Sequence, residues 1–312
     1  MSTATQSDSA PTNSCAVVVT YHPEMAALLK LLSQLNRETD FLVIDNGSPQ
    51  AERLRESIVA YSRCLEYRQL TENVGLAQAL NYGLEEVKNR NYKYALLFDQ
   101  DSSLGDLYVE SMLAAYQEAL EINGEEVNKG KVAAIGPRVI NPQTRRQTPF
   151  KLFNRILFRS DQPFHDSRHL FQADILITSG TFLVLKCLDD IGPMKASYFI
   201  DNVDLEWCFR AKSRGYALVG TDRAILYHAI GERSESPLVR KGLLAKHNPH
   251  RTYYSSRNRV HLYGVSYSPW GWKLRDFVRF FIKACWLILT STQRRQYWQN
   301  ITAGIRDARN LS

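Results

Sequence analysis

Cysteine is scarce in this sequence, and long uncharged runs are absent from it. The five cysteines are scattered, none lies in a Cys-x-x-Cys pair, and their odd number argues against a disulfide framework. We expect them to be small buried apolar side chains in a reducing compartment. Residues 1–14 are polar and have no apolar core, so we expect a disordered tail there and not a signal peptide. No uncharged stretch reaches the length of a transmembrane helix.

The composition is typical of a globular protein. Of 312 residues, 44% are hydrophobic and 23% are charged, which suits one large α/β domain with an appendage. The net charge of +7 favours an acidic partner, such as nucleotide phosphates, anionic lipid or nucleic acid. Charge alone does not choose among these three. The sequence contains no internal repeat.

Strand-like and helix-like segments alternate through the first half of the chain. The apolar runs CAVVVTYHP, FLVIDNGSPQ, YALLFDQDS and KVAAIGPRV are typical of buried parallel strands, and helical periodicity separates them. This alternation predicts right-handed βαβ units and a mostly parallel sheet. Ligands of such sheets bind beyond the carboxyl ends of the strands. After about residue 150 the pattern loosens into loops and antiparallel strands.

Polar residues stand at three of these strand ends: Thr20, Asp45, and the pair Asp99 and Asp101. Because residues i and i+2 of an extended chain face the same way, the carboxylates of Asp99 and Asp101 can enter one crevice. Two acids so close repel each other unless a cation or hydrogen-bond donors neutralise them. Oxygen ligands suit Mg²⁺ or Mn²⁺, which can also carry a diphosphate. We favour a metal site over a simple turn.

Two further residues each have two interpretations. Asp45 either forms a turn by bonding its own backbone or accepts a hydrogen bond from a nucleobase. His228 follows a strand-like run. A single histidine is more often a structural residue than a ligand, although a neutral imidazole does bind ions such as Mn²⁺.

A third group of acids, Asp201, Asp204 and Glu206, precedes a predicted helix. Capping and compensation of the helix dipole would explain one or two of them. They do not explain the dense mixture of acids with Trp207 and Arg210. A general base needs a carboxylate near a reacting hydroxyl, and this group can supply one.

In order along the chain, seven segments resemble the family 2 inverting glycosyltransferases of the GT-A fold, and among them the bacterial rhamnosyltransferases that build O-antigens and related polysaccharides. The segments are VVVTYHP, VIDNGS, ENVGLAQALNYGL, LLFDQDSSL, TSGTFLVL, FIDNVDLEWCFRAKSRGY and ILYHAIGER. The resemblance covers roughly residues 16–264. It implies a Rossmann-like GT-A domain over 15–264, with a mostly parallel sheet flanked by helices, followed by a C-terminal helical segment over 265–312.

The resemblance also implies roles for matching positions. A divalent cation, Mg²⁺ or Mn²⁺, would be held by Asp99, Asp101 and His228. The residues that would bind the nucleotide-sugar donor are Thr20, Tyr21, Asp45, Asn73, Gly75, Asp99, Arg251, Arg257 and Asn258. The acceptor region would include Gly180, Glu206 and Trp207.

The resemblance leaves two candidates for the catalytic base. Many members of this family have a Glu-Asp pair, which is followed in sequence by x-Asp-Leu and an arginine. Alignment on Arg210 places the catalytic aspartate on Asp204 and the preceding acid on Val203, so the match is imperfect and Asp201 competes. The base would take a proton from the acceptor hydroxyl as it attacks the anomeric carbon, in a single displacement with inversion. A metal and cationic side chains would offset the charge of the departing diphosphate.

The end of the chain is basic and aromatic. From Trp272 a helix is predicted, and Arg275, Arg279 and Lys283 recur every four residues along one stripe of it. This pattern favours a helix on an anionic membrane surface over one that packs on the core or on a second copy in a homo-oligomer. The enzyme would then be cytoplasmic, peripheral on the inner face of the membrane, with a polyprenyl-linked acceptor.

The expected activity is transfer of L-rhamnose from dTDP-L-rhamnose to a sugar hydroxyl of a polysaccharide acceptor. Two alternatives stay open: the same fold with a UDP-sugar donor (galactofuranose, glucose or N-acetylglucosamine), and a non-catalytic nucleotide-sugar-binding protein at the membrane. Nucleic acid is not expected as a partner, because the acidic strand ends would repel it from the crevice.

Overall fold

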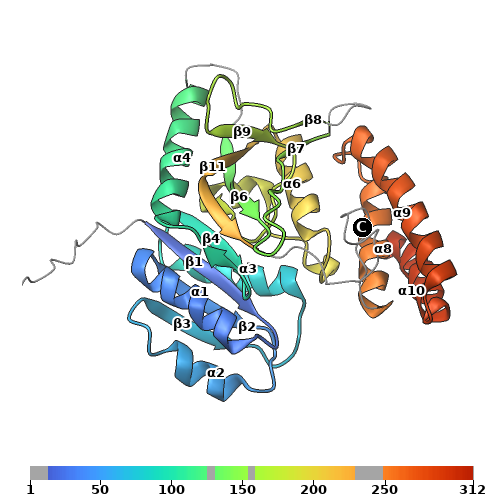
Figure 1. The fold of residues 1–312 in the computed structure, drawn as a ribbon, viewed down its shortest axis with the longest axis horizontal. Coiled ribbons are helices and arrows are strands. Elements are labelled where there is room, and N and C mark those ends of the chain that lie inside the picture. The colour runs from blue at the N-terminus through green and yellow to red at the C-terminus, as the bar shows by residue number, and fades with distance from the viewer. Residues whose placement is uncertain (1–12, 125–130, 154–158, 229–248, 312) are drawn as a thin grey trace, which may run out of the picture.

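The computed structural model describes residues 13–124, 131–153, 159–228 and 249–311. A mixed sheet forms its centre (Figure 1), with strands in the order β3-β2-β1-β4-β10-β6-β11-β5 and with β9 beside β11. The strands are β1 (Ser14–Thr20), β2 (Asp40–Asp45), β3 (Cys64–Gln69), β4 (Tyr94–Asp99), β5 (Ser103–Leu104), β6 (Val132–Ile140), β9 (Leu170–Ala173), β10 (Phe182–Val184) and β11 (Ala217–Tyr227).

The long strands of the sheet are parallel to their long neighbours. β1 pairs in parallel with β2 and β4, β2 with β3, and β6 with β11. The antiparallel pairs all involve the short strands β5, β9 and β10. Every residue of β1 is buried, because helices cover both faces of this part of the sheet. The predicted α/β class, with βαβ units first and antiparallel strands later, is confirmed.

Helices connect and cover these strands. They are α1 (Met25–Glu38), α2 (Ala51–Ile58), α3 (Leu76–Asn89), α4 (Tyr108–Gly124), α5 (Leu188–Ile191) and α6 (Val203–Ser213), with short 3₁₀ turns η1 (Leu185–Cys187) and η2 (Ala196–Tyr198). The apolar face of α1 is buried through Leu28, Leu31, Leu32 and Leu35, at the spacing of an amphipathic helix. A separate hairpin of β7 (Lys151–Leu152) and β8 (Arg159–Ser160) lies beside β9.

Three helices follow the sheet domain: α8 (Pro249–Gly264), α9 (Trp270–Thr290) and α10 (Arg294–Asp307), closed by the 3₁₀ turn η3 (Ala308–Leu311). They stand together on the right of Figure 1. Arg259 of α8 forms an ion pair with Asp276 of α9 and lies over the ring of Phe280. The predicted helix from Trp272 is therefore confirmed, and it begins two residues earlier. Across the parts of the chain that can be described, no helix has both the length and the apolarity to cross a membrane.

One glycine sets how closely two of these helices approach. A Cβ added at Gly304 of α10 would lie 2.5 Å from the carbonyl oxygen of Tyr253 and 3.0 Å from the backbone nitrogen of Arg257, both on α8. These neighbours are backbone atoms, which cannot turn aside as a flexible side chain can. Only glycine at this position lets α8 and α10 pack at their present distance.

We therefore predict that Gly304→Val lowers the free energy of unfolding by about 1–3 kcal/mol, the usual cost of overpacking. Gly264→Val is the matched control, since a Cβ at Gly264 would meet nothing within 4 Å. Urea denaturation of both variants beside the wild type measures the difference. An equal loss of stability in the two variants would contradict the close approach of the helices.

Candidate active site

The predicted strand-end residues lie at one edge of the sheet. Thr20 is in register with Asp45, and Val19 is in register with Asp99, so the carboxyl ends of β1, β2 and β4 meet. Gln100 ties the loop after β4 to the end of β1: its side-chain oxygen accepts from the backbone N–H of Tyr21 at 2.7 Å, and its Nε2 donates to the Tyr21 carbonyl at 3.1 Å. No pattern in the sequence indicated this role of Gln100.

Asp45 has the turn-forming interactions that one of its two interpretations required. Its carboxylate accepts from the Thr20 hydroxyl at 2.9 Å, from the Ser48 hydroxyl at 2.6 Å and from the Ser48 backbone N–H at 3.0 Å. Both Thr20 and Asp45 are 0% exposed. A ligand contact at either side chain would therefore require the turn to open, whereas the neighbouring Tyr21 is exposed.

Asn73 and Gly75 shape the loop before α3. The Asn73 side-chain oxygen accepts from Asn46 Nδ2 and from the Gly75 backbone N–H, both at 2.9 Å. Gly75 has a φ of +87°, and a Cβ there would lie 2.6 Å from the ring of Phe199. This position therefore requires glycine on two counts. The contact brings the loop against the segment that contains Asp201.

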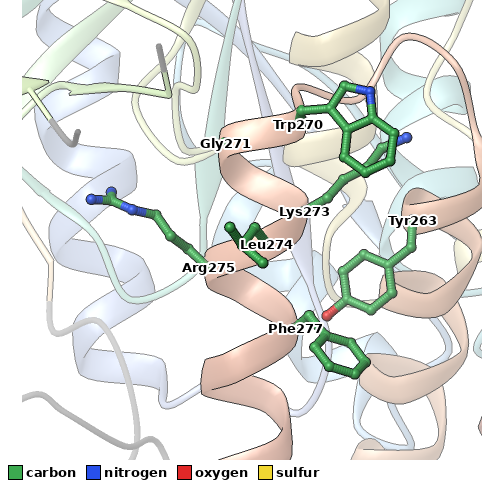
Figure 2. A pocket seen from close by; sticks show the side chains of 7 residues that line it. All are labelled: Tyr263, Trp270, Gly271, Lys273, Leu274, Arg275 and Phe277. Atoms are coloured by element: carbon green, nitrogen blue, oxygen red, sulfur yellow. The ribbon is translucent and has the colours of Figure 1, made fainter. Parts of the chain in front are cut away.

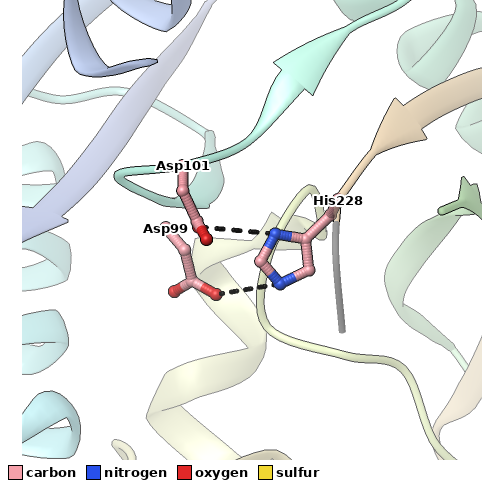
Figure 3. Close-up of side chains that lie close together, drawn as sticks. All are labelled: Asp99, Asp101 and His228. Atoms are coloured by element: carbon pink, nitrogen blue, oxygen red, sulfur yellow. Dashed lines mark ion pairs between the residues drawn. The ribbon is translucent and has the colours of Figure 1, made fainter. Parts of the chain in front are cut away.

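The side chains of Asp99, Asp101 and His228 converge, with ligand atoms within 4.8 Å of one another. Figure 3 shows both carboxylates turned toward the imidazole. His228 Nδ1 lies 3.4 Å from Asp101 Oδ1, and Nε2 lies 3.9 Å from Asp99 Oδ2. Nδ1 is buried, and among the described residues it has no hydrogen-bond partner. An unsatisfied buried nitrogen beside two carboxylates fits a divalent-cation site of the Mg²⁺ or Mn²⁺ type.

The backbone and the charges around Asp99 hold this cluster in place. Asp99 N–H donates to the Ser179 hydroxyl, which is 2.6 Å from the Ser102 hydroxyl. Burial raises the pKa of the Asp99 carboxyl, and the charge of Asp101 raises it further, while His228 and Arg251 lower it. A carboxylate in these surroundings gains stability from a bound cation. Ser179 is another site residue that the sequence did not indicate.

The two candidates for the base differ in their partners. Asp201 accepts three contacts from the Arg251 guanidinium, at 2.7, 3.1 and 3.2 Å. Asp204 has no such cation on its carboxylate among the described residues, and it accepts from the Leu205 backbone N–H at 2.8 Å. Burial raises the pKa of Asp204 to about 6, and the charges of Asp201 and Asp99 contribute. A carboxyl group with this pKa is suited to accept a proton near neutral pH.

Asn258 and Arg257 hold the segment that carries both acids. Phe199, Asp201 and the following Asn202 have φ values of 62°, 64° and 59°, a run that strains L-residues. The amide of Asn258 donates to the carbonyls of Tyr198, Ile200 and Asp201 at 2.8–2.9 Å. Arg257 donates to the Tyr198 carbonyl at 3.3 Å. Because Asn258 is 0% exposed, it acts here on the loop and not on a ligand.

The three residues expected in the acceptor region are built into the packing. Glu206 is buried, and it accepts from Arg210 and, at 2.7 Å, from the Tyr267 hydroxyl. Trp207 is buried and donates its indole N–H to a backbone carbonyl at 3.1 Å. Gly180 has a φ of +82° and follows Ser179 directly. Gly180 is therefore next to a residue that bonds the backbone of Asp99, in the cluster of Asp99, Asp101 and His228 that we call the metal-type cluster.

Comparison with known proteins agrees with this geometry. The model of the family "Glycosyl transferase family 2" matches residues 16–180, more than half of the chain. A curated relative, dTDP-rhamnosyl transferase RfbF of Shigella flexneri, is 26% identical over 289 residues, which cover 91% of each chain. The family match includes Asp99 and Asp101 and ends before His228 and both candidate bases.

Two solved structures share the fold. GalNAc-T7 with UDP, GalNAc and Mn²⁺ has a TM-score of 0.60 at 13% identity; the match covers 94% of this chain but 57% of that one. S. aureus TarS 1–349 with UDP-GlcNAc has a TM-score of 0.57 at 16% identity, covering 95% of this chain and 81% of that one. At these identities the likeness shows the GT-A architecture, as predicted.

The raised pKa of Asp204 predicts a pH-dependent effect on stability. The carboxyl has a pKa of about 6 in the folded protein and an ordinary value of 3.8. The folded state therefore binds the proton more tightly, and the wild type loses stability as the pH rises through this interval. Asp204→Asn should remove that cost and raise the free energy of unfolding above pH 6, by at most about 3 kcal/mol.

Denaturation at pH 4 and pH 8 measures this difference. Asp201→Asn is the matched control: it removes the partner of the Arg251 guanidinium, so it should lower stability at pH 8. A stabilisation by Asp204→Asn that does not change between the two pH values would be inconsistent with the raised pKa.

Proposed function

Because this chain belongs to glycosyl transferase family 2, we propose that it transfers L-rhamnose from dTDP-L-rhamnose to a sugar hydroxyl of a lipid-linked acceptor, with inversion. One observation supports the proposal: Asp99, Asp101 and His228 converge in the metal-type cluster, and the charge of Asp99 acts on Asp204, a carboxyl with a raised pKa. The Shigella flexneri relative, named as a dTDP-rhamnosyl transferase, supports rhamnose as the sugar. The UDP ligands of the two solved structures keep a UDP-sugar as the second candidate donor.

The cluster at the strand ends would hold a divalent cation, Mg²⁺ or Mn²⁺. The two carboxylate groups and Nδ1 of His228, which has no hydrogen-bond partner among the described residues, supply oxygen and nitrogen ligands that suit such a cation. A bound cation would offset the negative charge that the diphosphate of the donor gains as the sugar leaves. Tyr21, exposed at the end of β1, would border the nucleotide.

Asp204 would accept the proton of the acceptor hydroxyl as that oxygen attacks the anomeric carbon. Asp201 is less suited to this task, because the Arg251 guanidinium engages it at 2.7 Å. The Arg251 guanidinium already occupies the carboxylate oxygens of Asp201, whereas Asp204 has the raised pKa that a base near neutral pH needs. Asp201 would instead position Arg251 near the departing diphosphate.

The donor is tested by thermal shift and by slow donor hydrolysis across a panel of nucleotide sugars, with and without Mn²⁺ or Mg²⁺. We expect dTDP-rhamnose to stabilise the protein only with metal, and Asp101→Ala to abolish that effect because a metal ligand is lost. Asp106→Ala, which changes an exposed acid five residues further along the chain, is the matched control. Asp204→Asn should keep the thermal shift and lose about 10²–10⁴-fold in transfer rate.

A preference for a UDP-sugar would keep the fold and the mechanism but contradict the proposed sugar. Stabilisation by no nucleotide sugar would contradict catalysis of this kind and favour a binding protein.

We also propose that α9 lies on an anionic membrane surface. Its outer face exposes an apolar stripe at helical spacing, and Trp270 is 82% and Phe281 63% exposed. The members of the stripe are Trp270, Leu274, Phe277, Val278, Phe281, Ile282 and Leu289. A mostly apolar cavity of about 630 Å³ opens at its first turns, lined in part by Tyr263, Phe277 and Arg275 (Figure 2). The Lys273 ammonium lies over the ring of Trp270 at 5.2 Å, and a basic residue beside an exposed aromatic one suits the headgroup region of a bilayer.

Vesicle co-sedimentation tests this placement. The wild type should bind vesicles that contain phosphatidylglycerol more strongly than pure phosphatidylcholine vesicles, and more weakly at high salt. Phe277→Ser combined with Phe281→Ser should reduce binding by about tenfold or more, because two exposed rings no longer enter the interface. Val59→Ser, at an equally exposed site far along the chain, is the control. If the double variant lost a dimer and no vesicle binding, the stripe would be an interface between copies.

A further inference from the structure

Lys151 of β7 is joined to α9 through aromatic rings of the sheet domain. In an extended segment, Lys151 and Phe153 face the same way. The ring of Phe153 lies 5.9 Å from that of Phe209 on α6, and the Phe209 ring lies 5.2 Å from that of Trp272 on α9. Phe209 is buried between them. The side of β7 that carries Lys151 and the side of α9 that carries Trp272 therefore meet at α6.

Two cations of α9 share the face of Trp272. Arg279 follows Trp272 by seven residues, or two helical turns, and Lys283 follows Arg279 by one further turn. Trp272 is buried against Phe209, so this face of α9 is the one turned to the sheet domain. Arg279, which is exposed, and Lys283, which is half-buried, lie further along this face of α9. Lys151, Arg279 and Lys283 form what we refer to below as the cationic cluster.

Electrostatics agrees with this placement. Burial lowers the pKa of Lys151, the charge of Arg279 lowers it further, and the charge of Asp204 opposes both. Burial also lowers the pKa of Lys283 to about 8; Arg259, Arg251 and Arg279 act in the same direction, and Asp201 acts against them. The cluster therefore lies within electrostatic reach of both acids of the 201–204 segment.

The cluster lacks an anion of its own. Among the residues that the structure describes, no carboxylate lies within 4 Å of the charged nitrogens of Lys151, Arg279 or Lys283. The three positive side chains, of which Lys151 and Lys283 are half-buried, repel one another unless an anion lies between them. The metal-type cluster of Asp99, Asp101 and His228 is separate from the cationic cluster. The cation of α8 that acts on Asp99 is Arg251.

We propose that the cationic cluster binds the phosphate groups that join the acceptor sugar to its lipid. This inference rests on the proposed function. In an inverting displacement the acceptor approaches the anomeric carbon from the side opposite the departing diphosphate. The donor diphosphate belongs with the metal-type cluster, so a second anion site beside the base fits the acceptor. The exposed apolar stripe of α9 continues from the same helix and suits the hydrocarbon chain that follows such phosphates.

The probe for this site is inorganic diphosphate, titrated calorimetrically in EDTA so that metal-dependent binding at Asp99 and Asp101 is absent. The variant is Lys151→Gln with Lys283→Gln. The control, Arg294→Gln with Arg295→Gln, removes the same charge from exposed positions of α10. We expect the first pair to weaken diphosphate binding at least tenfold, the effect of losing charge-assisted contacts, and the control and Asp101→Ala to change it little.

A second measurement separates the acceptor from the donor and from membrane lipid. The Lys151→Gln, Lys283→Gln variant should keep the metal-dependent thermal shift with dTDP-rhamnose, which tests the proposed function by itself. Loss of that shift would assign the cluster to the donor and overturn the inference. Loss of binding to phosphatidylglycerol vesicles with unchanged diphosphate binding would assign it to membrane lipid and overturn it as well. Diphosphate binding that is unchanged in the variant would also overturn the inference.

Discussion

The mutual repulsion of carboxylates at one end of the sheet is the constraint on which the rest of the site depends. Four aspartates gather at one end of the sheet, and each carboxylate has different neighbours: Asp99, Asp101, Asp201 and Asp204. Asp99 and Asp101 face His228 in the metal-type cluster. Asp201 is paired with Arg251. The pKa of Asp204 is raised to about 6, so the same crowding that lowers stability leaves a carboxyl suited to accept a proton near neutral pH.

The C-terminal helices are part of this balance and not a simple addition to the sheet domain. Arg251 and Asn258 lie on α8, where one neutralises Asp201 and the other bonds the strained backbone around it. α8 in turn packs on α10 through Gly304. A predicted boundary between 15–264 and 265–312 separates α8 from the two helices that contact it. The boundary stays a prediction, but α8, which bonds the segment of Asp201, packs against residues beyond it.

The sequence predicted the fold and the positions of the strand-end acids, because alternation and buried strands are local patterns. It could not choose between Asp201 and Asp204, since the choice depends on Arg251, which is 50 residues from Asp201. The roles of Gln100 and Ser179 also rest on tertiary partners. The periodicity of residues 249–264 is weak, and its arginines and tyrosines suggested ligand binding, whereas Asn258 turned out to bond buried backbone. Local patterns thus placed the acids, whereas their different neighbours come from tertiary contacts.

The order of charges along the crevice implies an order of loading. The charge of Asp99 is among the causes that raise the pKa of Asp204, so a cation held at Asp99 would offset it and favour the ionised base. An anion on Lys151 would have the opposite effect, because it would offset cations near Asp204. A base that must be ionised when the acceptor arrives is therefore best prepared by the donor and its metal first. Because a cation at Asp99 and an anion at Lys151 would act on the pKa of Asp204 in opposite directions, that sequence is the favoured one.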